Sequence, residues 1–251
     1  DWSSDVCSSD LFKAQTENIH PGLSVDCVII SFHEQKMKIL LNKYKLSKLW
    51  MLPGGLVHKE EDVDEAVQRV LLQRTGLTNI KLRQFYLFGK KDRCNIDNNR
   101  DLLESYGVSP DDIPNLMSRY ATLGYFAFVR YDQVSLSEDD TDLSMWFDID
   151  KIPKLSHDHN EIINRAIKHI RLLIDVIPIG YELLPEEFTI VELRKIYEDI
   201  LGEELDKRNF RKRMLTSELI VSLDKKRESD PYPQPNLYSF NMKRIEELLD
   251  L

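Results

Sequence analysis

The stretch that decides the fold runs from Gly55 to Leu77 and reads GLVHKEEDVDEAVQRVLLQRTGL. Its second half predicts an amphipathic helix, because apolar residues recur at helical spacing along one face. These residues are Val63, Ala66, Val67, Val70 and Leu71. The acidic run Glu60, Glu61 and Asp62 comes just before this pattern. Acids at the start of a helix complement its dipole whether or not a metal binds, so the run alone does not indicate a metal site.

Strand patterns surround this helix on both sides. They cover 23–32, 37–44, 84–88, 123–131 and 142–148. Residues 160–176 form a strongly amphipathic pattern and predict a closing helix. Residues 94–118 are polar and open with turn-forming residues, so we expect an inserted surface excursion there. Together these patterns predict an α+β domain over residues 22–176.

The spacing within 55–77 resembles the signature box of the Nudix family. Gly55 is followed after five residues by Glu61 and after seven more by Arg69, and Gly76 and Leu77 close the box. The preceding WMLPGG, residues 50–55, resembles the family's loop into the box helix. The resemblance implies a Nudix α/β/α sandwich with a mixed sheet.

Three positions of the box depart from the family pattern. Where an active member carries the glutamates that hold a divalent metal on a pyrophosphate, this chain has Val70, Gln73 and Arg74. Val70 is apolar, Gln73 is a poor ligand for Mg²⁺, and Arg74 places a fixed positive charge where the family places metal. We therefore expect no catalysis, no metal and no cofactor. The alternative is a hydrolase of nucleoside diphosphate derivatives that holds its metal with Glu60 and Glu61.

The first domain keeps residues that are suited to bind a small molecule. We expect the effector to contact five residues: Trp50, Gly54, Gly55, Arg69 and Arg93. The two arginines carry forked donors suited to phosphate or carboxylate.

Each of the larger side chains also has a plain structural alternative. Arg69 could pair with Glu61, Trp50 could pack in the core, and Arg93 could be a solvated charge. For His157 and His159 we favour capping and packing over metal binding, since no cysteine partner accompanies them.

The second half of the chain has the element order of a winged helix. Thr189 and Glu192 form a capping box, Gly202 ends the helix that follows, and Asp206 is suited to cap a second helix. Two short strands, 220–223 and 237–240, then flank a proline-rich loop. Helix, turn, helix and hairpin predict a winged helix over 186–251, joined to the first domain by a linker at 177–185.

This region carries a local basic patch. From Asp206 to Arg227 there are eight basic and three acidic residues, a net charge of +5. Phe210 and Met214 lie four apart on the side we expect to be buried. The residues predicted to contact DNA are Lys207, Arg208, Asn209, Arg211, Lys212, Arg213, Lys225, Lys226 and Arg227. A solvated helix face is the alternative.

The stretch LDKRNFRKRM, residues 205–214, resembles the winged helix of the NrtR-like, Nudix-related transcriptional regulators. The resemblance covers residues 22–251. It implies a homodimer on an inverted-repeat DNA operator, controlled by a sugar or an ADP-ribose-type nucleotide that binds a non-catalytic Nudix domain. The wing SDPYPQPN, residues 229–236, lacks the glycines common in that family, which leaves its base contacts in question. A protein-interaction adaptor would bind no DNA.

The composition fits this interpretation. The 251 residues are 42% hydrophobic and 31% charged, with a net charge of −9, which is typical of a globular chain and excludes a polybasic, histone-like binder. No apolar run approaches the length of a membrane span. Three cysteines argue against a disulfide framework, so we expect a cytoplasmic protein. Residues 1–11, DWSSDVCSSDL, match the translation of a common sequencing-library adapter, and we exclude them as an artefact that includes Cys7.

Overall fold

The computed structural model describes Phe12, Thr16 and residues 18–78, 80–136, 142–227 and 234–249. The proposed adapter segment 1–11 lies outside these residues, as does the wing tip 228–233. The chain divides into two compact units. The first contains residues 1–30, 39–127 and 134–166, and the second contains 31–38, 128–133 and 167–251.

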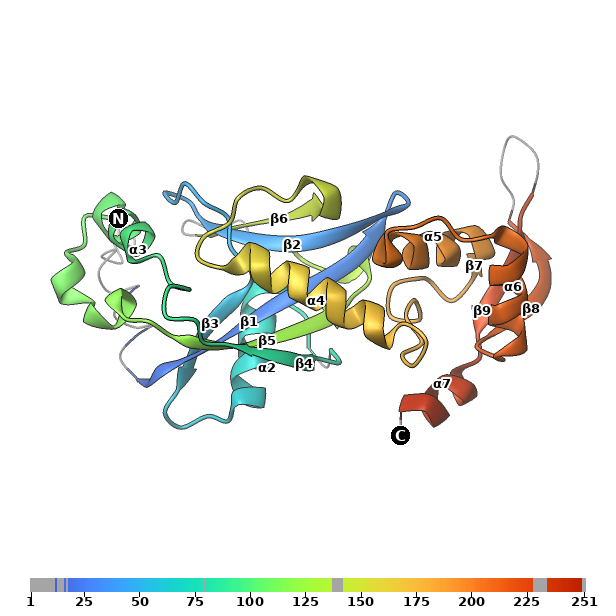
Figure 1. Cartoon of the computed structure of the whole chain (residues 1–251), viewed down its shortest axis with the longest axis horizontal. Helices are drawn as coiled ribbons and strands as arrows, with labels where there is room; N and C mark the ends of the chain where they lie inside the picture. Colours follow the sequence, from blue (N-terminus) through green and yellow to red (C-terminus); the bar gives the residue numbers. More distant parts are fainter. Residues whose placement is uncertain are drawn as a thin grey trace, which may run out of the picture. The chain divides into compact units, whose positions relative to one another are not determined.

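The first unit is built on a six-stranded sheet (Figure 1). Its strands are β1 (Ile19–His33), β2 (Lys36–Tyr44), β3 (Gly54–His58), β4 (Arg83–Phe88), β5 (Ala121–Phe128) and β6 (Asp142–Asp148). Five strands follow the order β4-β5-β1-β2-β6, and β3 pairs antiparallel with β1. The predicted strands are therefore confirmed, although β5 ends at Phe128 and a short helical turn, Tyr131–Gln133, follows it.

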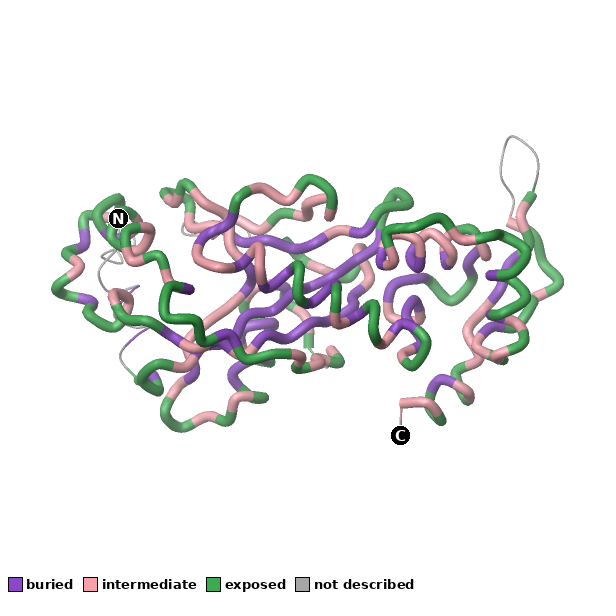
Figure 2. The backbone as a smooth tube through the Cα atoms, viewed as in Figure 1, coloured by how far each residue is buried: buried purple, intermediate pink, exposed green. Residues whose placement is uncertain are grey.

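Two helices flank this sheet, α2 (Val63–Thr75) and α4 (His159–Leu173). In Figure 1, α4 crosses in front of the strands and α2 lies behind them. Cys27, Val28, Ile29 and Ile30 of β1 are all fully buried, as expected for a central strand covered on both faces. Figure 2 shows this continuous buried stretch running through the sheet. The predicted α+β sandwich with a mixed sheet is confirmed.

The inserted segment differs from the polar excursion we expected. It folds into α3 (Ile96–Ser105) and two short helical turns, Pro110–Asp112 and Pro114–Met117. Leu103, Val108 and Ile113 are buried there around Phe12. The segment therefore has a small hydrophobic core of its own, which its many polar residues concealed in the sequence.

The second unit contains the predicted two helices and two-stranded hairpin, together with a short strand, β7 (Phe188–Thr189), and a final helix, α7 (Met242–Leu249), that were not predicted. The predicted elements are α5 (Ile190–Leu201), α6 (Lys207–Thr216), β8 (Ile220–Lys226) and β9 (Asn236–Phe240). Thr189 and Glu192 form the expected capping box, and Gly202 takes the left-handed conformation that ends α5. Asp206 caps α6 by accepting a hydrogen bond from the Asn209 N–H at 2.8 Å. Both helix signals in the sequence are therefore confirmed.

The segment predicted as a linker, 177–185, is not an extended flexible chain. Ile179, Leu183 and Leu184 are buried within the second unit. The Leu184 N–H donates to the Gly180 carbonyl at 2.8 Å, which makes a compact turn. Apolar anchoring of this kind gives the segment a fixed conformation. None of the helices in the described part of the chain has the length and apolarity that a membrane crossing requires.

Candidate effector cavity and DNA-binding surface

A cavity of about 1090 Å³ opens in the first unit. It is lined by the start of β1, the loop after β2, the box helix α2, the loop that carries Arg93, the inserted segment and the turn before α4. Gly54, Gly55, Arg69 and Arg93, four of the five predicted effector residues, are among its lining residues. A cavity of this size suits a metabolite.

The two charged residues retained from the box bind each other. The Arg69 Nε donates to Glu61 Oε2 at 3.0 Å, and the Arg69 Nη2 also donates to the Leu56 carbonyl at 2.9 Å. The His58 N–H donates to Glu61 Oε1 at 2.7 Å. These contacts, above all the hydrogen bonds from Arg69, hold the pKa of Glu61 below its usual range. The ion-pair alternative for Arg69 is thus realised, and both carboxylate oxygens of Glu61 already accept hydrogen bonds within the protein.

The residues at the three family metal positions do not fit a metal. Val70 is buried, and a Cβ placed on Gly55 would lie 2.7 Å from its Cγ2. Gln73 is exposed, and Arg74 pairs with Asp142 of β6 while both side chains are largely buried. Within the described ranges, no group of three or more histidine, cysteine or acidic side chains is placed to hold a metal ion. Val70 and Arg74 therefore offer no oxygen ligand to a divalent metal at their positions on this helix.

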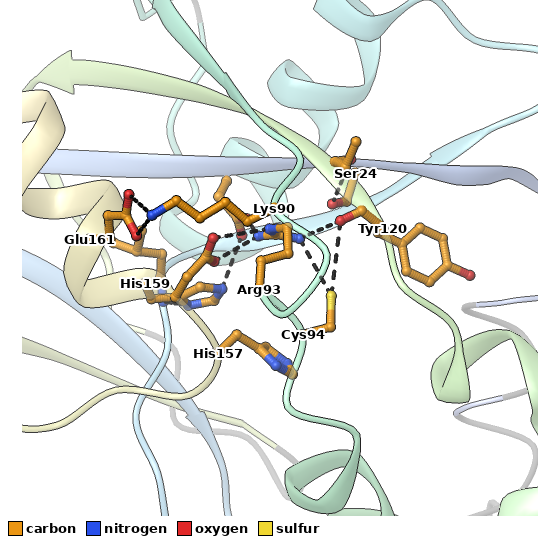
Figure 3. Close-up of polar contacts among 12 residues, drawn as sticks. Ser24, Lys90, Arg93, Cys94, Tyr120, His157, His159 and Glu161 are labelled. Atoms are coloured by element: carbon orange, nitrogen blue, oxygen red, sulfur yellow. Dashed lines mark hydrogen bonds and ion pairs between the residues drawn. The ribbon is translucent and has the colours of Figure 1, made fainter.

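Arg93 is not the solvated charge that one interpretation allowed. Its side chain is 3% exposed and pairs with Asp158 at 2.9 Å and with Asp26 at 3.5 Å. Its Nη1 also donates to the Tyr120 carbonyl at 2.7 Å (Figure 3). The loop that carries Arg93 turns the side chain inward because two buried carboxylates compensate its charge there.

His157 and His159 act as hydrogen-bond acceptors next to this network. The Nδ1 of His159 accepts from the Leu52 N–H at 2.9 Å, and the Nδ1 of His157 accepts from the Asn95 N–H at 3.1 Å. Burial lowers the pKa of each to about 4, so both rings are neutral at pH 7. The packing role that we favoured for them matches this geometry.

Trp50 is not among the residues that line the cavity, and its effector contact stays a prediction. Its ring packs against Phe147 with centroids 5.0 Å apart, and the Lys43 ammonium lies 5.3 Å from the ring centre. Met51 and Leu49, on either side of it, do line the cavity. Successive side chains of an extended segment point to opposite sides, so the tryptophan faces away from the cavity.

The basic residues of α6 fall into two groups. Lys207, Arg208 and Lys212 are exposed, and none forms an ion pair with a residue that the structure describes. Arg211 donates through Nε to the Tyr238 hydroxyl at 2.8 Å, and Arg213 lies 3.4 Å from Asp175. Phe210 and Met214 are buried on the opposite face, as predicted.

Two of the three predicted wing cations are held by acids of the same unit. Lys225 pairs with Glu187 at 2.8 Å, and Arg227 pairs with Glu192 at 2.8 Å. Burial alone would raise the pKa of Glu192, but hydrogen bonds from Arg227 and Thr189 hold it below its usual range. Arg227 therefore ties the wing to the cap of α5.

Comparison with known proteins matches each half of the chain to a known domain family. The NUDIX domain profile matches residues 20–166, and the NrtR DNA-binding winged helix domain profile matches residues 180–240. The chain belongs to the Nudix family. Its Nudix domain is followed by a winged helix domain of the NrtR type.

Two relatives and one solved protein show how far the likeness extends. The ADPR responsive transcriptional repressor NtrR of Acinetobacter baylyi is 27% identical over 230 residues, which is 89% of this chain and 83% of the repressor. The ADP-ribose pyrophosphatase of Methanocaldococcus jannaschii is 31% identical over 148 residues, or 58% of this chain and 72% of that enzyme. Shewanella oneidensis NrtR shares the fold with a TM-score of 0.67 at 23% identity, and the match covers 90% of this chain and 96% of that one.

Sequence reasoning missed several residues of this Nudix domain. Asp26 lines the cavity but lies within a hydrophobic strand pattern, and Asn98 belongs to the segment we expected to be a surface excursion. The sequence offered one usable signal, since Asp26 is the single charged residue in the run LSVDCVIISF. A charge at that place in a buried strand indicates a paired or functional group.

Proposed function

We propose that this protein is a DNA-binding transcriptional regulator whose Nudix domain binds a small-molecule effector without hydrolysing it. The observation that carries the proposal is the altered box. Val70, Gln73 and Arg74 replace the family's metal ligands, while the cavity beside them remains. The effector would bind within 22–176, and the winged helix of 186–251 would hold DNA. No metal or cofactor is needed for either role.

An ADP-ribose-type nucleotide is the first candidate effector. The Acinetobacter repressor, which resembles this chain over most of its length, is described as responsive to ADP-ribose. Relatives that share a ligand site often share the ligand's chemical class. We therefore expect ADP-ribose to raise the thermal stability of the protein, by about 2.7 kcal/mol at roughly 100 times its Kd.

A sugar is the second candidate, and the charges of the cavity favour it. The three arginines of the cavity wall are each paired with a carboxylate: Arg69 with Glu61, Arg74 with Asp142, and Arg93 with Asp158. A diphosphate needs cations that are not already neutralised, and Lys48 is the only lysine or arginine of the lining that makes no ion pair with a described residue, whereas an uncharged polyol needs only paired donors and acceptors. Thermal-shift measurements with ADP-ribose, ribose, arabinose and xylose would decide between the two classes.

The DNA-binding half of the proposal predicts an inverted-repeat operator bound by a homodimer. Selection from random duplex DNA would yield the operator, and analytical ultracentrifugation of the complex would give its stoichiometry. A monomer on one asymmetric site would contradict the dimer. Failure to enrich any duplex sequence would contradict DNA binding and favour an adaptor.

The rival activity is hydrolysis, as in the Methanocaldococcus enzyme. Incubation of the protein with ADP-ribose and Mg²⁺ or Mn²⁺ tests it directly. We expect no release of AMP above the rate without protein. Metal-dependent turnover by the unmodified chain would overturn the non-catalytic assignment.

A further inference from the structure

One end of the cavity contains a buried carboxylate whose hydrogen-bonding capacity is not filled. The Asp26 side chain is 9% exposed and lines the cavity. Its charged and imidazole neighbours include Arg93 Nη2 at 3.5 Å and His159 Nε2 at 3.7 Å, and the Thr122 side chain is a further polar neighbour. Both distances exceed the usual 2.7–3.2 Å of an N–H···O hydrogen bond, and a carboxylate can accept about four such bonds.

Two further polar groups line the same cavity. His157 uses Nδ1 as an acceptor for the Asn95 N–H, which leaves the proton of its neutral ring on Nε2 as a donor. Asn98 lies in the first turn of α3, and its side-chain amide makes no hydrogen bond with any residue in the described part of the chain. Asn95, which caps α3, joins the two through its bond to His157.

The charges at the Asp26 end of the cavity determine which chemical group of a ligand can bind there. Arg93 is already paired with Asp158 and bonded to the Tyr120 carbonyl, so it carries no uncompensated charge for a phosphate. Asp26 offers acceptors, His157 offers a donor, and Asn98 offers both. A hydroxyl group donates and accepts, so two neighbouring hydroxyls match this set of groups, whereas an anion would face the Asp26 carboxylate.

We propose that the hydroxyl-bearing part of the effector lies against Asp26, His157 and Asn98, where the inserted segment begins. The inference rests on the proposed effector function and adds the residues that select the ligand. It gives the inserted segment a role, since α3 supplies one wall of this end. The hydroxyls could belong to a free sugar or to a ribose of a nucleotide, because both present the same chemistry.

The test measures affinity by calorimetry for probes with and without hydroxyls. ADP-ribose is compared with 2′,3′-dideoxy-ADP, which lacks the neighbouring hydroxyls of both riboses, and D-ribose is compared with 2-deoxy-D-ribose. The variants are Asp26→Asn and Asn98→Ala, and the control is Arg100→Ala. Arg100 is on the same helix, pairs with Asp97 and does not line the cavity. Circular dichroism and DNA affinity without a probe check the fold, and Asn98→Ala carries the test if Asp26→Asn fails to fold.

Each outcome separates the inference from the function on which it rests. We expect the two variants to weaken ADP-ribose or ribose at least tenfold, to change the hydroxyl-poor probe less than twofold, and to leave Arg100→Ala at the unmodified affinity. Equal losses for both members of a probe pair, or no loss, would overturn the inference alone. If the unmodified protein binds neither ADP-ribose nor a pentose, the effector function fails and the inference fails with it.

Discussion

Arg74 replaces a metal ligand of the family with a cation that needs a partner of its own. Arg74→Ala would remove the guanidinium from the Asp142 carboxylate, which is 13% exposed. Breaking such a pair from one side costs about 3–5 kcal/mol. We expect the free energy of unfolding in urea to fall by about 3 kcal/mol.

The double variant Arg74→Ala with Asp142→Ala is the matched control. It should be more stable than the single variant, because the Asp142 carboxylate that Arg74 balances is removed together with it. Equal stability of the two would mean that the pair contributes no coupling energy at this position.

His159 predicts how stability depends on pH. Its pKa is lowered by burial to about 4, while a histidine in the unfolded chain titrates near about 6.5. Between these values the unfolded chain binds a proton that the native protein does not, so stability falls as the pH falls through this window. At pH 5 the loss should reach about 2 kcal/mol relative to pH 7.5.

The variant His159→Asn isolates this contribution, because an amide oxygen can still accept the Leu52 N–H. We expect a shallower decline between pH 7.5 and pH 5 when urea unfolding of the two proteins is compared. His157 is unchanged and should contribute the same slope in both. Parallel curves would show that the pKa of His159 is the same in the native and the unfolded protein.

Among the elements, α6 and the wing should contribute to DNA binding in different ways. Arg208 is exposed on α6, so Arg208→Ala should weaken DNA binding by about 1–3 kcal/mol if it reads a base edge, or lower the salt dependence if it contacts a phosphate. Arg227 instead pairs with Glu192 at the cap of α5. Its replacement by alanine should lower the melting temperature as well as DNA affinity.

Fluorescence anisotropy over a range of salt concentrations, with melting curves for each variant, distinguishes these roles. Lys226→Ala is the control in the wing, since its side chain is exposed and makes no ion pair among the described residues. We expect it to weaken binding to all sequences alike without lowering the melting temperature. An unchanged melting temperature in Arg227→Ala would contradict its structural role.

Most elements were predictable because their signals are local. The capping box at Thr189 and the apolar stripe that includes Val70 each lie within a few residues of the structure they determine. β3 was missed because Gly54 and Gly55 suggest a loop, whereas their missing Cβ atoms allow close contact with Asp26 and Val70. α7 and β7 were missed because both are short.

The site was less predictable than the fold. Arg93 and Asp26 are 67 residues apart, and only the folded sheet brings them to one cavity. The sequence does not show on which side Trp50 lies, because a one-residue difference in an extended segment reverses the side to which a side chain points. The DNA contacts of the wing cations stay predictions, and the sequence does not show that Glu187 and Glu192 face Lys225 and Arg227.

At the scale of the whole molecule, the turn between β1 and β2 offers a route for regulation. It belongs to the second unit together with α5, and the Met37 N–H donates to Asp199 Oδ2 at 3.0 Å. Lys195 holds the other oxygen of Asp199 at 2.7 Å. If this contact transmits the effector signal, Asp199→Ala should reduce the factor by which the effector changes DNA affinity, while each ligand alone still binds.

Coupling is reciprocal, so DNA must change effector affinity by the same reduced factor. Titrations of effector with and without operator DNA measure it from both directions. Asp175→Ala is the control, because this exposed acid pairs with Arg213 and does not contact the turn. Coupling that is undiminished in Asp199→Ala would place the signal on another path.

The division of the chain into units also bears on how such regulators can be recombined. A new sensor could be attached to this DNA reader by joining sequences near residue 177. The second unit, however, also takes in residues 31–38 and 128–133, which lie inside the Nudix sequence. A chimera joined only near residue 177 would take the segments equivalent to 31–38 and 128–133 from the new sensor. These segments would not match the rest of the second unit. A functional graft would have to exchange three segments together, so exchange of sensors between regulators should succeed mainly where these two short pieces already match.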